Sequence, residues 1–241
     1  MHVGATGGTL FASYNIHKCV GVDGRFDPGR IARVIGEIGP DVIALQEADK
    51  RFGDRQGLLD LARLERDTGL TPVPVKNDHK GHGWHGNLIL VREALVEKTN
   101  QISLPGHEPR GALVVDVSLP EVKVRVVAAH LGLLRQARLN QIATLVSVAR
   151  RETGNPIVLM GDFNEWRRRG RTALQALAPG FGPVESGVAT FPAYYPVLPL
   201  DRIVARPHNL LAPLQAHDTP LARSASDHLP VKAQLRRNTT A

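Results

Sequence analysis

The chain is poor in cysteine and in aromatic residues. It has one cysteine, Cys19, in 241 residues, and aromatic residues make up 5% of the sequence. A single cysteine cannot form an internal disulfide, which excludes a disulfide-stabilised scaffold and suits a reducing compartment. No apolar run reaches membrane-spanning length, and residues 1–9 lack the basic start and long apolar stretch of a secretory signal. We therefore expect a cytoplasmic protein with no integral membrane segment and no implied protein partner.

The chain also lacks any stretch that resembles a linker between two domains. We predict a single domain over residues 1–241, with residues 1–9 and 236–241 frayed. The net charge is +7 and the isoelectric point is near 10.0. This excess of basic residues suits an anionic partner, namely nucleic acid, a phosphorylated small molecule or an anionic lipid head group, without choosing among the three.

Hydrophobic periodicity predicts many strands and few helices. The expected strands are 10–16, 41–45, 87–91, 96–104, 112–119, 122–129, 156–160, 189–191, 203–205 and 229–235. The expected helices are 28–38, capped by Asp27 with Pro28 at its first position, 58–68, 135–151 and 171–178. These elements indicate an α/β fold in which two sheets pack face to face and helices cover them on the outside.

Six short polar clusters lie at the edges of the apolar runs. They are SYNIH (13–17), LQE (45–47), AHL (129–131), GDFN (161–164), LDR (200–202) and SDHL (226–229). Glu47, His130 and Asp162 follow apolar runs, whereas Asp201 and His228 precede them. Strands that enter and leave through one edge of the sheets would gather these side chains in one cleft.

The oxygen-bearing side chains of these clusters suit a divalent metal ion. Glu47 is the first choice of ligand, Asn15 a neutral neighbour and Asp227 a second carboxylate. Mg²⁺ binds in proteins through one or two carboxylates and takes other ligands from water and substrate phosphate, and Mn²⁺ accepts similar ligands. A zinc site is not indicated, because Cys19 is solitary and the histidines lack a compact ligand spacing outside a Gly-rich loop.

The remaining polar residues suit the activation of water and the stabilisation of charge. Asp162 can hold or deprotonate the attacking water, and Asn164 can orient that water or a phosphate oxygen. His228 is a candidate catalytic imidazole whose tautomer and pKa Asp201 would set. His130 would donate a hydrogen bond to a non-bridging phosphate oxygen.

Each of these residues also has an ordinary structural interpretation. GDFN is a good turn sequence after a strand, because Gly, Asp and Asn favour turns. Glu47 suits a solubilising loop position, Asp201 a charge at a strand edge and Asp227 a turn cap, while a lone histidine such as His130 is commonly a hydrogen-bonded core residue. The functional interpretation rests on six such clusters that share one placement.

With these clusters in hand, the chain resembles the endonuclease/exonuclease/phosphatase superfamily from about Phe11 to Leu235, most specifically in GDFN followed by SDHLP. The resemblance implies a four-layer sandwich, with two mixed or antiparallel central sheets flanked by helices, and a magnesium-dependent phosphoesterase site at one edge. It also implies roles for single positions: Asn15 and Glu47 on the metal side, Asp162 and Asn164 as the water-orienting pair, Asp201 and His228 as the Asp–His dyad, Asp227 as the acidic neighbour of that histidine, and His130 as a phosphate-binding histidine. Either Asp162 or His228 acts as the base in such enzymes.

A narrower resemblance links the stretches 14–21, 24–33, 84–87 and 109–113 to small bacterial members of this superfamily. By analogy, Lys18, Asn87 and Arg110 contact substrate phosphate, although long basic side chains are also common on solvated surfaces. One departure from the pattern is Cys19, where such proteins often carry glycine.

Three functions therefore stand as alternatives. The first is a metal-dependent phosphodiesterase or phosphatase that acts on a small-molecule or lipid phosphoester, which the compact chain favours. The second is a DNA or RNA nuclease that uses the basic stretch Trp166–Arg171, although that stretch also reads as a solvated surface turn. The third is a non-catalytic phosphate-binding module, which the joint presence of a water activator and an acid/base dyad argues against.

Overall fold

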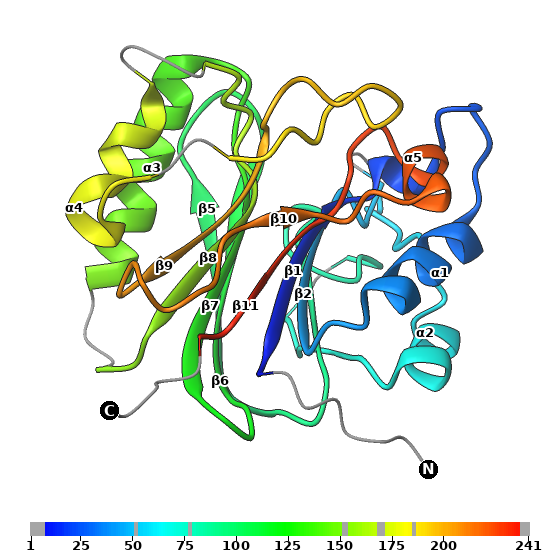
Figure 1. Ribbon diagram of the computed structural model, residues 1–241, viewed down its shortest axis with the longest axis horizontal. Coiled ribbons are helices and arrows are strands. Elements are labelled where there is room, and N and C mark those ends of the chain that lie inside the picture. Colours follow the sequence, from blue (N-terminus) through cyan, green and yellow to red (C-terminus); the bar gives the residue numbers. More distant parts are fainter. Residues whose placement is uncertain are drawn as a thin grey trace.

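The computed structural model describes residues 8–50, 53–76, 79–150, 154–167, 172–184 and 187–236. Two twisted sheets pack face to face at its centre, and helices cover both outer faces (Figure 1). One sheet has six strands in the order β10-β11-β1-β2-β4-β3, and the other has five in the order β5-β6-β7-β8-β9. Both sheets contain parallel and antiparallel pairs, so the predicted α/β four-layer sandwich is confirmed.

The six-stranded sheet is built around the parallel pair β1 and β2. β11 is antiparallel to β1 on one side, and β4 is antiparallel to β2 on the other. The carboxyl ends of β1 and β2 therefore lie at the same edge as the start of β11. The strand bounds are β1 Leu10–Asn15, β2 Val42–Gln46, β3 Thr71–Pro72, β4 Leu88–Val91, β10 Gln215–Ala216 and β11 Val231–Gln234.

The five-stranded sheet is antiparallel except for the parallel pair β7 and β8. The ends of β7 and β8 and the start of β9 consequently meet at one edge. The strand bounds are β5 Leu95–Leu104, β6 Arg110–Ser118, β7 Lys123–His130, β8 Ile157–Asp162 and β9 Asp201–Arg206.

Alternation along the strands divides the apolar side chains between an inner core and two outer ones. Phe11 packs in the core between the sheets, while its neighbour Ala12 faces the outer helices. Val126 and Val127 divide in the same way on the other sheet. The strands of both sheets therefore have nearly continuous apolar sequences, because each sheet is covered on both faces.

The helices form the two outer layers. In Figure 1 α1, α2 and α5 cover the six-stranded sheet, and α3 and α4 cover the five-stranded sheet. Asp27 caps α1 as predicted, by accepting a hydrogen bond from the backbone N–H of Arg30. The helical segments are η1 His17–Cys19, α1 Pro28–Ile38, α2 Leu61–Thr68, α3 Arg135–Arg150, η2 Ala173–Leu177, α4 Ala178–Phe181 and α5 Pro220–Ala225.

Several predicted boundaries were wrong. The helix expected at 58–68 begins only at Leu61, because Asp60 is its cap. The helix expected at 171–178 is a 3₁₀ segment, Ala173–Leu177, followed directly by the short helix α4, Ala178–Phe181. The short strands β3 and β10 and helix α5 were not predicted, although Thr219 followed by Pro220 is a recognisable cap for α5.

The expectation about the chain ends is corrected in part. Thr9 donates its backbone N–H to Glu121, and Arg236 donates a side-chain N–H to the carbonyl of Leu211, so both positions are held. Residues 1–7 and 237–241 lie outside the described residues. Among the described helices, none is long and apolar enough to cross a membrane.

Candidate active site

Three predicted residues lie side by side at the edge of the five-stranded sheet. His130 ends β7, Asp162 ends β8 and Asp201 begins β9, and the strand register pairs His130 with Asp162 and Asp162 with Asp201. All three side chains are buried. The backbone ladder alone thus brings together residues that are up to 71 positions apart (201 − 130 = 71).

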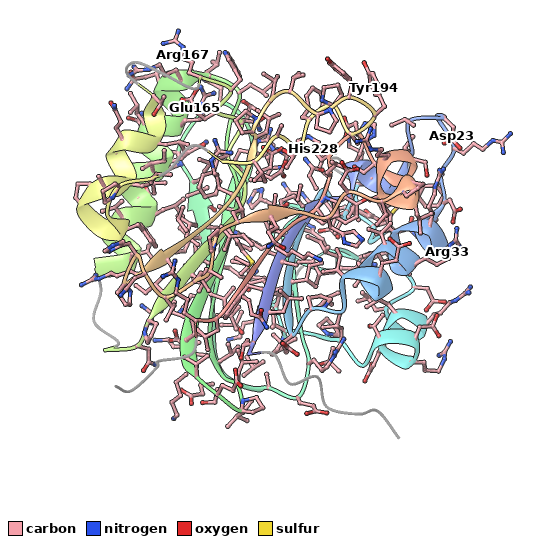
Figure 2. All side chains as sticks on the ribbon, viewed as in Figure 1. Asp23, Arg33, Glu165, Arg167, Tyr194 and His228 are labelled. Atoms are coloured by element: carbon pink, nitrogen blue, oxygen red, sulfur yellow. The ribbon has the colours of Figure 1, made fainter. Side chains whose placement is uncertain are left out.

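Two hydrogen bonds join this row to the other sheet. Asn15, the last residue of β1, donates its amide Nδ2 to Asp162 Oδ2 over 2.9 Å. The Nδ1 atom of His228, which precedes β11, lies 2.9 Å from Asp201 Oδ2. The site therefore spans both sheets at one end of the sandwich, where Figure 2 labels His228.

The Asp162 carboxylate is the acceptor that these groups share. Its Oδ1 accepts the backbone N–H of Asn164 at 2.9 Å, while its Oδ2 lies 3.4 Å from His130 Nε2 and 3.7 Å from His228 Nε2. Gly161 immediately before it has φ +150°, and a Cβ there would collide with the carbonyl oxygen of Ala129. The close approach of β7 to β8 therefore requires glycine at this position.

Asn164 is held in a strained conformation beside Asp162. Its φ of +50° lies in the left-handed region, which non-glycine residues adopt rarely. Its side-chain Nδ2 donates to the carbonyl of Leu131, just beyond β7. The GDFN turn is thus anchored to the neighbouring strand, and its strain marks it as a candidate functional turn.

The two buried histidines have opposite pKa shifts. Burial lowers the pKa of His130 to about 4, against the attraction of Asp162, so the ring is neutral at pH 7. Burial also opposes the charge on His228, but the carboxylates of Asp201 and Asp162 outweigh it and raise the pKa to about 10. Thr190 adds a hydroxyl donor to Asp201 Oδ2 at 2.6 Å. His228 is therefore an imidazolium held by two carboxylates.

Glu47 lies on the six-stranded side, just after β2. Its φ is +58°, a second strained non-glycine residue at this edge. Burial raises the pKa of Glu47, but His130 and Lys18 outweigh it and hold the pKa below its usual value. Lys18 Nζ lies 2.9 Å from Glu47 Oε2. The Glu47 carboxylate is therefore ionised and attracts a cation.

Lys18 is presented by an unusual turn, η1. His17, Lys18 and Cys19 have φ values of 45°, 54° and 61°, so three consecutive L residues are left-handed. The last of them is the position where glycine was expected by resemblance. The backbone conformation that favours glycine is thus present, although the residue is a buried cysteine.

The other predicted residues are placed less centrally. Asp227 is partly exposed, and its Oδ1 lies 3.8 Å from His17 Nδ1. Asn87 is fully buried, and its Nδ2 donates to the carbonyls of Trp84 and Gly111. Arg110 is held at 2.8 Å by Glu108. Their roles in metal and substrate binding stay predictions.

A pocket opens beside Glu47 and His130. Four of its lining side chains are basic, namely Lys18, Lys50, Arg55 and Arg110, and it also includes Asp49, His85, Gly86 and Pro109. Arg55 Nη1 lies 3.4 Å from His85 Nδ1. Sequence reasoning did not identify Lys50, Asp49 or Arg55, because they lie further along the loop after Glu47 and none of them is at the edge of an apolar run.

A buried ion pair behind the GDFN turn was also missed. Glu165, directly after Asn164, is fully buried, and its Oε2 lies 3.5 Å from Nη2 of the equally buried Arg138 on α3. Glu165 also accepts the backbone N–H groups of Arg167 and Ala173. Arg138 belongs to none of the polar clusters in the sequence, so only the packing of the turn reveals the pair.

Two sets of groups offer ligands for a metal ion. Asp162, Asp201 and His228 present ligand atoms within 4.8 Å of one another. In that set the Nδ1 atom of His228 already lies 2.9 Å from Asp201 Oδ2. The residues predicted as ligands, Glu47, Asn15 and Asp227, carry the oxygen atoms that a hard divalent cation prefers.

Comparison with known proteins places this arrangement in a family. The model of the Endonuclease/Exonuclease/phosphatase family matches residues 12–228. The uncharacterized protein YbhP of Escherichia coli strain K12 is 33% identical over 164 residues, which cover 64% of this chain and 63% of that protein. The match therefore spans less than two thirds of the relative.

Two solved structures share the fold. An endonuclease/exonuclease/phosphatase from Beutenbergia cavernae is 24% identical with a TM-score of 0.69, and the match covers 98% of this chain and 73% of that one. The mannosyl-6-phosphatase Bt3783 of Bacteroides thetaiotaomicron is 18% identical with a TM-score of 0.68, covering 95% of this chain and 100% of that one. At sequence identities this low, the similarity shows a shared fold alone.

Proposed function

Because this chain belongs to the endonuclease/exonuclease/phosphatase family, we propose that it is a divalent-metal-dependent phosphoesterase that hydrolyses a small-molecule or lipid phosphoester. The observation that carries the proposal is the environment of Asp162, whose carboxylate lies within 3.7 Å of Asn15, Asn164, His130 and His228. Such a convergence of an acid, amides and two imidazoles suits attack of water on phosphorus.

Glu47 would hold the metal ion, with Asn15 and Asp227 as further oxygen donors, and Mg²⁺ or Mn²⁺ fits this set. When bound, the ion supplies charge neutralisation for the phosphate oxygens. The ionised state of Glu47 supports this assignment, because a cationic ammonium already lies against its Oε2.

Asp162 and Asn164 would hold the attacking water and remove its proton. His228 is protonated at neutral pH, which suits it to stabilise negative charge or to donate a proton to the leaving oxygen, and leaves Asp162 as the base. Asp201 and Thr190 would keep the imidazole in place.

The phosphate itself would bind in the basic pocket beside Glu47. The neutral His130 can donate a hydrogen bond, while Arg110 and Lys18 contribute positive charge. The predicted contact of Asn87 with phosphate would have to come from its Nδ2 group, which in this structure donates to the carbonyls of Trp84 and Gly111.

The first test is a metal-supplemented screen over aryl phosphodiesters, aryl phosphomonoesters, inositol phosphates, phospholipids, nucleotides and nucleic acids. We expect Mg²⁺- or Mn²⁺-dependent hydrolysis of at least one phosphoester, and its loss in EDTA. Hydrolysis of DNA or RNA alone, falling steeply with salt and with charge reversal of Arg167, Arg168 and Arg169, would instead indicate the nuclease. No hydrolysis of any phosphoester with any metal would refute the proposal.

The second test removes the central groups. Asp162→Ala and His228→Ala should each lower kcat by about 10²-fold or more, the usual scale for one acid or base. His217→Gln is the matched control, because His217 is also a buried histidine beside a carboxylate, Glu37 at 3.0 Å, in the outer layer. Circular dichroism should show all three variants folded, and unchanged turnover in both site variants would overturn the mechanism.

A further inference from the structure

Exposed hydrophobic side chains are concentrated at one end of the molecule. Nine large hydrophobic residues are exposed among the described residues, and all but Leu95 lie on loops at the edge that carries His228 and Asp162. Solitary exposed apolar residues are normal on any protein surface, but their collection around one edge is not.

One group of these residues borders the five-stranded side. Leu133 and Leu134 follow β7 and are 54% and 62% exposed, and Trp166 follows β8 and is 47% exposed. Arg167, next to Trp166, is labelled at this end of the molecule in Figure 2. Leu133 and Leu134 stand where α3 begins, so neither packs in the core below.

A second group borders the six-stranded side. Val22 and Phe26 lie between η1 and α1, and Tyr194 and Tyr195, 65% and 70% exposed, lie in the loop before β9. Figure 2 shows Tyr194 at the same end as Arg167, with His228 below and between them. We call these seven residues of the two groups the rim.

The opposite edge provides the contrast. Leu95 begins β5 and pairs with Ser118 of β6, at the end of the sheet away from His130. It is 67% exposed and is the only large hydrophobic side chain exposed at that edge among the described residues. The rim is therefore a property of the catalytic edge and not of the strand ends in general.

The same edge of the molecule also carries several basic side chains. Lys18, Lys50, Arg55 and Arg110 line the pocket there, and Arg25, between Val22 and Phe26, is exposed. The ion pairs nearby each join one acid to one base, namely Asp23 with Arg30, Asp218 with Arg223, Glu47 with Lys18 and Glu108 with Arg110. Lys50, Arg55 and Arg25 are the basic side chains outside these four pairs. These three basic side chains, on a chain whose net charge is +7, make this edge complementary to an anionic surface.

A bilayer surface fits this pattern better than a protein partner. A protein interface needs a contiguous apolar core, whereas here single side chains stand on separate loops around a polar pocket. Leucine, tyrosine and tryptophan on loop tips, mixed with basic residues, are suited to the head-group region of anionic lipids. We propose that the rim docks the catalytic edge on anionic phospholipid bilayers and so presents the pocket to phosphoesters at the membrane surface. The second half of this statement rests on the proposed function; the docking does not.

The test is co-sedimentation of the full chain with vesicles of phosphatidylcholine alone or with added phosphatidylglycerol. We expect binding that requires the anionic lipid and weakens with salt. The double variants Leu133→Ser/Leu134→Ser and Tyr194→Ser/Tyr195→Ser should each bind about tenfold more weakly, because several apolar groups no longer enter the interface. Leu95→Ser is the matched control and should bind as the unaltered chain does.

The outcomes separate docking from catalysis. Turnover of a soluble aryl phosphoester should be unchanged in the rim variants, since none of these side chains belongs to the site. Equal binding by rim variants and the unaltered chain, equal loss in Leu95→Ser, or a self-associated state in light scattering that the rim substitutions abolish would each overturn the proposal. Vesicle binding without hydrolysis of any phosphoester would refute the proposed function and leave the docking intact.

Discussion

The two sides of the cleft are built differently. On the five-stranded side, His130, Asp162 and Asp201 are buried strand residues whose neighbours are set by register. On the six-stranded side, Lys18 and Glu47 stand on turns with positive φ, and their side chains are 46% and 24% exposed. The candidate base Asp162 is thus held by sheet hydrogen bonds, whereas the candidate metal ligand Glu47 and its neighbour Lys18 depend on strained turns.

This difference implies that the strand residues around Asp162 are held rigidly, whereas the turns that carry Lys18 and Glu47 can vary. A ladder position cannot move without disturbing the sheet, so the geometry around Asp162 is robust to changes in nearby loops. Turns can change sequence and shape at little cost to the core, which suits them to adapt substrate choice. Substitutions on the two sides should therefore affect different properties of the protein.

The largest effect is expected on the five-stranded side. Arg138→Met leaves the fully buried Glu165 without its ion-pair partner, and we expect a loss of about 3 kcal/mol in the free energy of unfolding. Urea unfolding measures it. Arg223→Met, which removes the exposed pair with Asp218, is the control and should change stability far less. Equal losses in the two variants would show that the buried pair does not support the GDFN turn.

On the six-stranded side, Glu47→Gln should impair metal use and spare the fold. We expect the metal concentration for half-maximal activity to rise at least about tenfold, the scale on which weakened ligand sets lose affinity. Glu93→Gln is the matched control, because Glu93 is also a glutamate with positive φ, 46°, shortly after a strand, at the far edge. A parallel change in both variants would argue against Glu47 as a ligand.

A smaller effect on stability is expected in the left-handed turn before α1, where glycine should be more stabilising than alanine. At Cys19, with φ +61°, we expect Cys19→Gly to be more stable than Cys19→Ala by about 1 kcal/mol, because glycine bears no Cβ strain there. At ordinary positions alanine is the more stable of the two. Thermal unfolding of the pair decides the sign, and a more stable alanine variant would mean that packing outweighs backbone strain in this turn.

The smallest effect concerns the surface of the same side. Hydrogen bonds from Arg30 hold the pKa of Asp23 at about 2, below its usual range. A lowered acid pKa stabilises the fold above the unfolded pKa of about 4 and ceases to do so as pH falls toward 2. Asp23→Asn should therefore lower Tm slightly at pH 7 and hardly at all near pH 2. A Tm difference that is independent of pH would refute this linkage.

Much of the site could be predicted because its residues stand at the ends of readable apolar runs. DVIAL before Glu47 and PIVLM before Asp162 indicate buried strands. A polar residue that follows a buried strand closely must lie at the edge of the sheet. The short β3, β10 and α5 were missed because segments of two to six residues carry too little periodicity to detect.

The amino-acid sequence by itself determined the layered α/β architecture and the clusters that lie at its edges, because burial of apolar runs is encoded residue by residue. Only the tertiary structure decided which clusters touch: the hydrogen bonds from Asn15 to Asp162 and from His228 to Asp201 cross between sheets. It also decided that Arg138 is buried against Glu165 and that the rim residues surround the edge that carries Asp162 and His228. These relations depend on how the two sheets and their loops pack, and local sequence patterns do not predict this packing.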